Sequence, residues 1–328
     1  MANINWLELF LDPNTQWILL GSILLGLSSG VLGSFAYLRK QSLMGDALAH
    51  AALPGVCIAF MLTGSKSILF FLIGAAVSGI IATFGVGFVT RNSRIKQDSA
   101  LGIVLSVFFG FGIVLLTQIQ HGGSGNQSGL DKFLFGQAAS MIHSDVVVMT
   151  IVALVLVAAC ALLFKEFKLL SFDSGFAKGL GYPVAFLEQL LMFLIVVAVV
   201  VGIQAVGVVL MSALLITPAV SARYWTERLG FMVALSGLFG AVSGFAGTLA
   251  STTANNLPTG PLSVLAATAL FAVSVVCAPR RGLLAKLLLR LSVRRAVLDE
   301  REPGTPLRRG QTAASLAAET QARKEGQA

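Results

Sequence analysis

Residues 99–119 have the sequence SALGIVLSVFFGFGIVLLTQI, a stretch of 21 residues without a charged side chain. At a rise of about 1.5 Å per residue, a helix of this length crosses the roughly 30 Å of hydrocarbon in a bilayer. A helix suits that environment because its backbone groups bond to one another where no water is available. The stretch therefore predicts one membrane span.

Eight further apolar stretches have a comparable length. They lie near residues 17–38, 44–63, 67–90, 146–164, 184–203, 205–222, 230–250 and 261–279. The sequence thus predicts an all-α, polytopic bundle of about nine transmembrane helices, with eight as the alternative. The two counts differ at 205–222, because only Gln204 separates this stretch from the one before it and glycines flank the join. A broken or re-entrant helix is the other interpretation there.

The composition of the whole chain agrees with a membrane protein. Of its 328 residues, 56% are hydrophobic and only 12% are charged, with a mean hydropathy of +0.85. A soluble domain carries about 25% charged residues, so a soluble globular enzyme is excluded. The three cysteines, Cys57, Cys160 and Cys277, lie in apolar stretches without metal-type spacing, and we interpret them as reduced packing residues.

The formal net charge of +8 is concentrated at the C-terminal end. Residues 280–328 carry 11 Lys/Arg against 5 Asp/Glu. This excess favours an anionic lipid surface over nucleic acid as partner. We therefore divide the chain into an interfacial segment (1–16), a transmembrane domain (17–279), a basic amphipathic cytoplasmic helix (280–298) and a disordered tail (299–328).

The distribution of basic residues also predicts an orientation. If the basic C-terminal end is cytoplasmic, nine spans place the N-terminus outside. Ten Lys/Arg then fall in the inner loops between spans, and only Lys66 and Lys132 fall in the outer ones. This asymmetry follows the positive-inside rule.

Three ionisable residues lie within the predicted spans: Asp46, His50 and Glu188. Each is a candidate functional residue, because an ionisable group in hydrocarbon costs about 2.5–3.5 kcal/mol. Asp46 and His50 are four positions apart, so a helix places them on one face. They could share a divalent ion such as Mn²⁺, Fe²⁺ or Zn²⁺, relay a proton, or form a structural pair. We interpret Glu188 as an interface residue or a helix-end partner of Lys178 rather than a ligand.

Further polar or soft side chains in the sixth and seventh stretches are candidates for lining a pathway. These are Gln204, Met211 and Thr217. A methionine in an apolar helix is more often a core residue, so that alternative stays open for Met211.

The inner segment 165–183 contains signals for a short helix. Asp173 is a candidate N-cap, Gly179 or Gly181 a helix end, and Pro183 a stop. Such a helix between two spans either docks a soluble partner or lies on the lipid surface, and composition favours neither.

Several catalytic motifs are missing from the sequence. It has no H-E-x-x-H and no G-x-x-x-x-G-K-[ST], and its G-x-S-x-G match at residues 26–30 lies inside the apolar stretch 17–38, not at a strand-to-helix elbow. An enzyme is therefore not expected, and any ATP hydrolysis belongs to a separate chain.

The segment SLMGDALAHAALPG, residues 42–55, resembles the membrane permease subunit of the manganese/zinc/iron family of ATP-binding-cassette importers. The similarity covers most of residues 17–279. Matching pieces are DSALGI at 98–103, FLFG at 133–136, Phe172-Asp173 with Ala177, Gly179 and Gly181, LLITPA at 214–219 and LPTGP at 257–261.

The resemblance implies a type II importer permease in a bacterial cytoplasmic membrane. Its partners would be a second permease subunit (another copy or a related chain), two cytoplasmic ATP-binding subunits and an extracytoplasmic metal-binding protein. No cofactor would be bound permanently, and the cargo would be a divalent metal ion. The resemblance makes Asp46 and His50 metal ligands or pathway residues. It makes the inner segment an ATPase-coupling loop through Phe172, Asp173, Ala177, Gly179 and Gly181.

Two positions point to the manganese branch of this family. Gln137 stands where zinc-type permeases often carry an acidic residue, and it is a further pathway candidate. Ser106 and Val107 occupy the neighbourhood where the zinc type tends to carry a second histidine. Zinc and iron remain the alternatives. A stand-alone proton-coupled metal transporter, a permease for a large chelate and a membrane-embedded enzyme are the competing classes.

Overall fold

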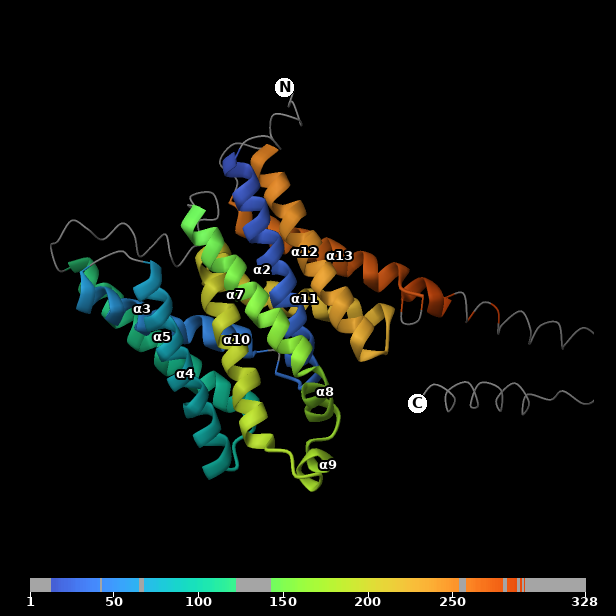
Figure 1. Cartoon of the computed structure of the whole chain (residues 1–328), viewed down its shortest axis with the longest axis horizontal. Coiled ribbons are helices and arrows are strands. Elements are labelled where there is room, and N and C mark those ends of the chain that lie inside the picture. Colours follow the sequence, from blue (N-terminus) through green and yellow to red (C-terminus); the bar gives the residue numbers. More distant parts are fainter. Residues whose placement is uncertain are drawn as a thin grey trace, which may run out of the picture. The chain divides into compact units, whose positions relative to one another are not determined.

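The computed structural model (Figure 1) is helical in the part of the chain that it describes. That part comprises residues 13–41, 43–64, 68–121, 143–253, 258–279 and 282–287, together with Arg290 and Ser292. The chain divides into two units, residues 1–283 and 284–328. Most of the predicted interfacial segment, and the whole of the predicted disordered tail, lie outside the described residues, so these assignments stay predictions.

The described residues of the first unit form eleven helices. They are α2 (Pro13–Leu38), α3 (Met44–Thr63), α4 (Ile68–Asn92), α5 (Gln97–His121), α7 (His143–Leu162), α8 (Phe164–Phe172), α9 (Ser174–Gly179), α10 (Val184–Val206), α11 (Val208–Trp225), α12 (Leu229–Thr253) and α13 (Thr259–Cys277). Among the described residues, eight are long and apolar enough to cross a membrane: α2, α3, α4, α5, α7, α10, α12 and α13.

The seventh predicted stretch is helix α11, and the expected break before it is present. Gly207 separates α10 from α11 and adopts a φ of +87°. This left-handed conformation suits glycine and ends α10 there. Gln204 belongs to the last turn of α10, so α11 begins at Val208 rather than at residue 205.

Helix α2 is the centre of one half of the unit and packs closely on α12 (Figure 1). A Cβ atom added at Gly26 would lie 2.1 Å from the carbonyl oxygen of Gly240, and one at Gly30 would lie 2.3 Å from that of Ser236. The Ser236 hydroxyl donates to the carbonyl of Gly30 over 2.7 Å. Small residues therefore let these two backbones touch, as is common between membrane helices.

Helices α3, α4 and α5 pack together as a second group, shown in blue to teal in Figure 1. Gly55 of α3 faces Gly74 of α4, and the Ser78 hydroxyl of α4 donates to the carbonyl of Ala51 over 2.6 Å. Helix α10 contacts both groups. It packs on α2 of the first group, and its Val196 lies against Gly79 of α4 in the second. The fold thus holds α3, which carries Asp46 and His50, between α4, α5, α10 and α11.

Candidate functional site

Asp46 and His50 lie on one face of α3, as the sequence predicted. Asp46 belongs to the first turn of the helix, and His50 follows one turn later. Their side chains are 38% and 19% exposed, and 3.5 Å separates His50 Nε2 from Asp46 Oδ1. An anionic carboxylate is favourable in a first turn, because the backbone N–H groups there are unpaired and the helix dipole is positive.

The distance between these two atoms suits a shared metal ion. It exceeds the roughly 2.9 Å of an ordinary N–H···O hydrogen bond. Two donors each about 2.2 Å from one ion lie roughly 3.6 Å apart at a tetrahedral angle. The pair therefore matches a two-donor edge of a metal site without a change in backbone.

The imidazole of His50 is oriented by α5. The ring meets Phe109 edge to face, with 4.7 Å between the ring centroids. Its Nδ1 atom is buried and has no hydrogen-bond partner, while Nε2 faces Asp46. Phe109 therefore holds the ring so that Nε2 is the nitrogen available to an ion.

The pair supplies only part of a coordination sphere. Within the residues that the structure describes, no group of three or more His, Cys, Asp and Glu side chains could hold a metal ion. An ion at Asp46 and His50 would therefore need further ligands from outside the described acidic, histidine and cysteine side chains. Incomplete ligation favours an ion that is released again, rather than one that is stored.

The backbone of α3 changes one turn beyond the pair. Pro54 lies inside the helix and has no N–H group to donate to the carbonyl of His50. The neighbouring residues Ala47, Ala49, Ala51 and Ala52 are all buried, so α3 packs through small side chains. The site therefore sits on a helix that is closely packed but has lost one backbone hydrogen bond.

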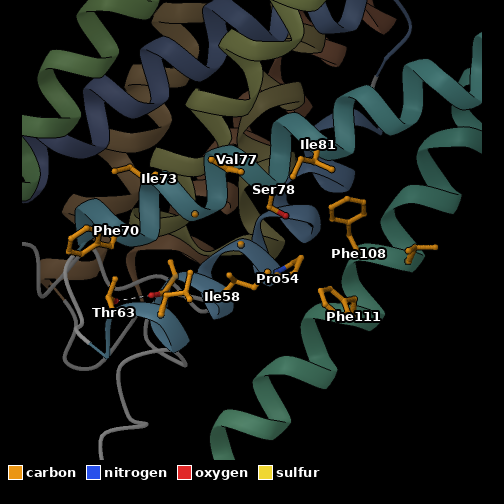
Figure 2. Close-up of a pocket in the computed structure, with 15 residues that line it drawn as sticks. Pro54, Ile58, Thr63, Phe70, Ile73, Val77, Ser78, Ile81, Phe108 and Phe111 are labelled. Carbon is orange, nitrogen blue, oxygen red and sulfur yellow. Dashed lines mark hydrogen bonds between the residues drawn. The ribbon is translucent and has the colours of Figure 1, made fainter.

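A cavity of about 570 Å³ lies between α3, α4 and α5 (Figure 2), and neither Asp46 nor His50 lines it. Figure 2 shows Pro54 and Ile58 of α3, Ile73, Val77 and Ile81 of α4, and Phe108 and Phe111 of α5 around it. Its hydroxyl groups are bonded within the protein: Ser78 donates to Ala51, and Thr63 donates to the carbonyl of Ala59 over 2.7 Å. The described walls of this cavity therefore offer mainly hydrocarbon contact.

Glu188 has a different partner from the one expected. Its Oε1 accepts from Nη2 of Arg39 over 2.5 Å, which joins α10 to the end of α2. Arg39, and not Lys178, therefore supplies the positive charge. The sequence pattern could not reveal this pair, because the two residues are 149 positions apart.

The candidate pathway residues are spread over different environments. Met211 is fully buried, and its sulfur occupies the space beside Gly202. Thr217 is partly buried on α11, and its carbonyl accepts from the Ser221 hydroxyl over 2.7 Å. The side chain of Gln204 and the whole of Gln137 lie outside the described residues. A pathway role for these residues stays a prediction.

The inner segment contains the expected capped helix. Asp173 is the N-cap of α9, and its Oδ1 accepts from the N–H of Phe176 over 2.8 Å. Gly179 is the last residue of α9, and Gly181 takes the left-handed conformation, with a φ of +85°. Ala177 is buried, which anchors α9.

The sequence interpretation missed an apolar surface on this segment. Phe172, Phe176 and Leu180 are each more than half exposed, whereas Phe167 of α8 is buried against Phe35 of α2. The large apolar side chains themselves were the available signal, but helical spacing does not relate them, because Phe172 ends α8, Phe176 lies in α9 and Leu180 follows α9. The segment thus has side chains buried against the bundle and others that are exposed.

The fold and the site are those of a polytopic helical membrane protein, with the polar pair Asp46 and His50 on α3 and exposed apolar side chains at Phe172, Phe176 and Leu180. The chain belongs to the ABC 3 transport family, whose family model matches residues 12–278.

Two curated relatives are similar over most of this chain. The manganese transport system membrane protein MntC of Bacillus subtilis is 59% identical over 295 residues, which cover 90% of this chain and 68% of that protein. The zinc transport system membrane protein TroC of Treponema pallidum is 48% identical, covering 88% of this chain and 96% of that protein.

A solved structure shares the fold. PsaBC from Streptococcus pneumoniae, in complex with Fab, matches with a TM-score of 0.75 and 34% sequence identity. The match covers 87% of this chain and 98% of that chain.

Proposed function

We propose that this chain is the transmembrane permease subunit of an ATP-driven importer for a divalent transition metal, with manganese as the cargo. The Asp46–His50 pair carries the proposal, because it places one carboxylate and one imidazole at ligand spacing inside a membrane-spanning helix. Zinc and iron are the alternative cargoes.

The donor set and the relatives both support a metal of this group. Oxygen and nitrogen donors suit Mn²⁺, Fe²⁺ and Zn²⁺ rather than ions that seek thiolates. The Bacillus relative named for manganese transport is 59% identical, and the Treponema relative named for zinc transport is 48% identical. Manganese is therefore the first choice.

The mechanism that fits this arrangement is alternating access. An extracytoplasmic metal-binding protein releases the ion between two permease subunits, where Asp46 and His50 replace part of its hydration shell. The two cytoplasmic ATP-binding subunits close on ATP, and the 165–183 segment carries that movement into the bundle. Because the pair supplies few ligands, the ion leaves once the site opens inward.

The proposed location is the bacterial cytoplasmic membrane, with the N-terminus outside and the C-terminus in the cytoplasm. This orientation requires α11 to cross the membrane as well, in addition to the eight described helices that are long and apolar enough by themselves. The basic residues Lys165, Lys168 and Lys178 support a cytoplasmic position for the inner segment. This segment presents the exposed apolar side chains, so its surface is accessible to a soluble ATP-binding subunit.

The proposed function is tested by uptake into vesicles that contain the permease, its ATP-binding subunit and the metal-binding protein. We expect Mn²⁺ to accumulate only with hydrolysable ATP. Zn²⁺ and Fe²⁺ are measured in parallel, and a preference for either would replace manganese as the cargo. Equal accumulation without ATP, driven by a pH gradient, would instead support a stand-alone transporter.

The proposed docking surface of Phe172, Phe176 and Leu180 gives a separate prediction. Phe176→Glu places a charge where an apolar side chain would be buried, so we expect binding of the ATP-binding subunit to weaken by about 10-fold or more. The measurement is co-purification of that subunit with the permease, backed by an affinity titration.

The control for this change is Phe186→Glu, since Phe186 is also exposed but lies on α10, beyond Pro183. Retained binding in Phe176→Glu, with loss in Phe186→Glu, would show that the docking surface lies elsewhere.

A further inference from the structure

We propose that the Arg39–Glu188 ion pair is a positioning element that carries movement of the inner segment to the Asp46–His50 pair. This inference rests on the proposed function. It adds the residues through which a movement of α9 would reach the ion at Asp46 and His50.

The ion pair is partly buried and connects the end of α2 to α10, so a movement of one helix can be transmitted to the other. Arg39 and Glu188 are only 14% and 29% exposed, and their charged atoms lie 2.5 Å apart. A partly buried pair is screened less by salt than a surface pair. It connects the residue that follows α2 to the second turn of α10.

Glu188 is connected to the inner segment without a flexible linker. The N–H of Tyr182 donates to Ala177, the N–H of Val184 donates to Tyr182, and the N–H of Leu187 donates to Pro183. The chain is therefore hydrogen-bonded from α9 into the first turn of α10. A displacement of α9 reaches Glu188 through a few bonded residues.

Arg39 is connected to α3 in a similar way. The N–H of Lys40 donates to Tyr37 and that of Gln41 donates to Ala36, which together form a Schellman turn at the end of α2. The N–H of Met44 then donates to Gln41, and α3 begins there, with Asp46 in its first turn. A shift of Arg39 is thus transmitted through one tight turn to Asp46.

This turn departs from the usual residue choice. Lys40 adopts a φ of +58°, where glycine is normally found. A residue with a Cβ atom costs roughly 1–2 kcal/mol in that conformation. Gln41 is only 2% exposed, and both its Oε1 and Nη1 of Arg39 are buried without a partner.

Buried polar atoms without partners are unfavourable, so this arrangement is not the best that the turn and the pair could make. In the proposal, the turn between α2 and α3 is the part that changes when α10 moves.

The test compares ion transport with ATP hydrolysis in the assembled importer. The variants are Arg39→Gln, Glu188→Gln and both together, reconstituted with the ATP-binding subunit and the metal-binding protein. We expect each single variant to lower the number of Mn²⁺ ions imported per ATP hydrolysed by about 5-fold, with little change in ATP turnover. The double variant should match the larger single effect, because both changes break one interaction.

Controls separate this role from a structural one. Arg94→Gln and Glu227→Gln remove exposed charges and should leave the ratio unchanged. Glu188→Asp keeps the charge with a shorter side chain. It should assemble like the wild type and lower the ratio by about 2-fold, which keeps the inference testable if Glu188→Gln does not fold.

The outcomes distinguish this inference from the proposed function. A lower melting temperature with an unchanged ratio would make the pair a structural connection and overturn the inference, as would single losses that multiply in the double variant. Absence of ATP-driven uptake in the wild type would overturn the proposed function itself, and the inference with it.

Discussion

Asp46→Ala and His50→Ala will each abolish ATP-driven Mn²⁺ uptake while the importer still assembles and hydrolyses ATP. Removal of a residue that only supports a metal ligand costs about 10- to 100-fold in affinity, so loss of a ligand should lower uptake by about 100-fold or more. The effect is large because the described residues offer no third acidic, histidine or cysteine side chain to compensate.

The chemistry of the pair sharpens this prediction. Asp46→Asn keeps the shape of the side chain but removes the negative charge, so we expect it to resemble Asp46→Ala. The measurement is initial uptake of Mn²⁺ in vesicles, together with equilibrium Mn²⁺ binding to the detergent-purified permease.

Matched controls for the pair lie elsewhere in the chain. Glu227→Gln removes an exposed carboxylate, and His121→Ala removes an exposed imidazole near the end of α5. Both should transport normally. Normal uptake in the Asp46 and His50 variants as well would overturn the ligand assignment and reopen a permease for a large chelate.

Gly240→Leu will strongly destabilise the bundle, because α2 and α12 touch through their backbones. A Cβ atom at Gly240 would lie 2.0 Å from the carbonyl oxygen of Gly26. Both atoms belong to packed helices, so neither can rotate away as a flexible side chain would. We expect a loss of about 3 kcal/mol even for Gly240→Ala, at the upper end for overpacked cores.

The measurement for this prediction is thermal unfolding of the purified chain in detergent, followed by size-exclusion chromatography. Gly230→Ala is the control on the same helix, because a Cβ atom there makes ordinary contact, 3.8 Å from Phe164. That variant should be neutral or slightly more stable, since alanine favours a helix over glycine. Equal melting temperatures for the variants at Gly230 and Gly240 would contradict the close approach.

The helices were predictable because lipid imposes a simple rule on sequence. A span must be long and predominantly apolar, and α3 and α10 begin at the residues where the predicted spans 44–63 and 184–203 begin. The N-cap at Asp173 was also predictable, since a capping carboxylate acts on an N–H only three residues away. Interactions between residues a few positions apart can be predicted from the sequence, because both partners lie in the same short segment.

The boundary between α10 and α11 was less predictable from hydropathy. Hydropathy gave little contrast between residues 200 and 210, so the start of the second helix was placed three residues early. The left-handed conformation of Gly207 decided the boundary. Its position depends on a backbone angle that many glycine-containing sequences could adopt.

The membrane bundle, the shared face of Asp46 and His50, and the capped helix of the inner segment were all predictable from the order of the residues. All three follow from periodicity and from contacts between residues close in the chain. The packing of the helices was needed to show that Phe109 orients His50, that Arg39 is the partner of Glu188, and that Phe176 is exposed while Phe167 is buried. Those facts depend on which helices pack together, and a side chain's partner across a bundle is set by helix crossing and rotation, which hydropathy does not encode.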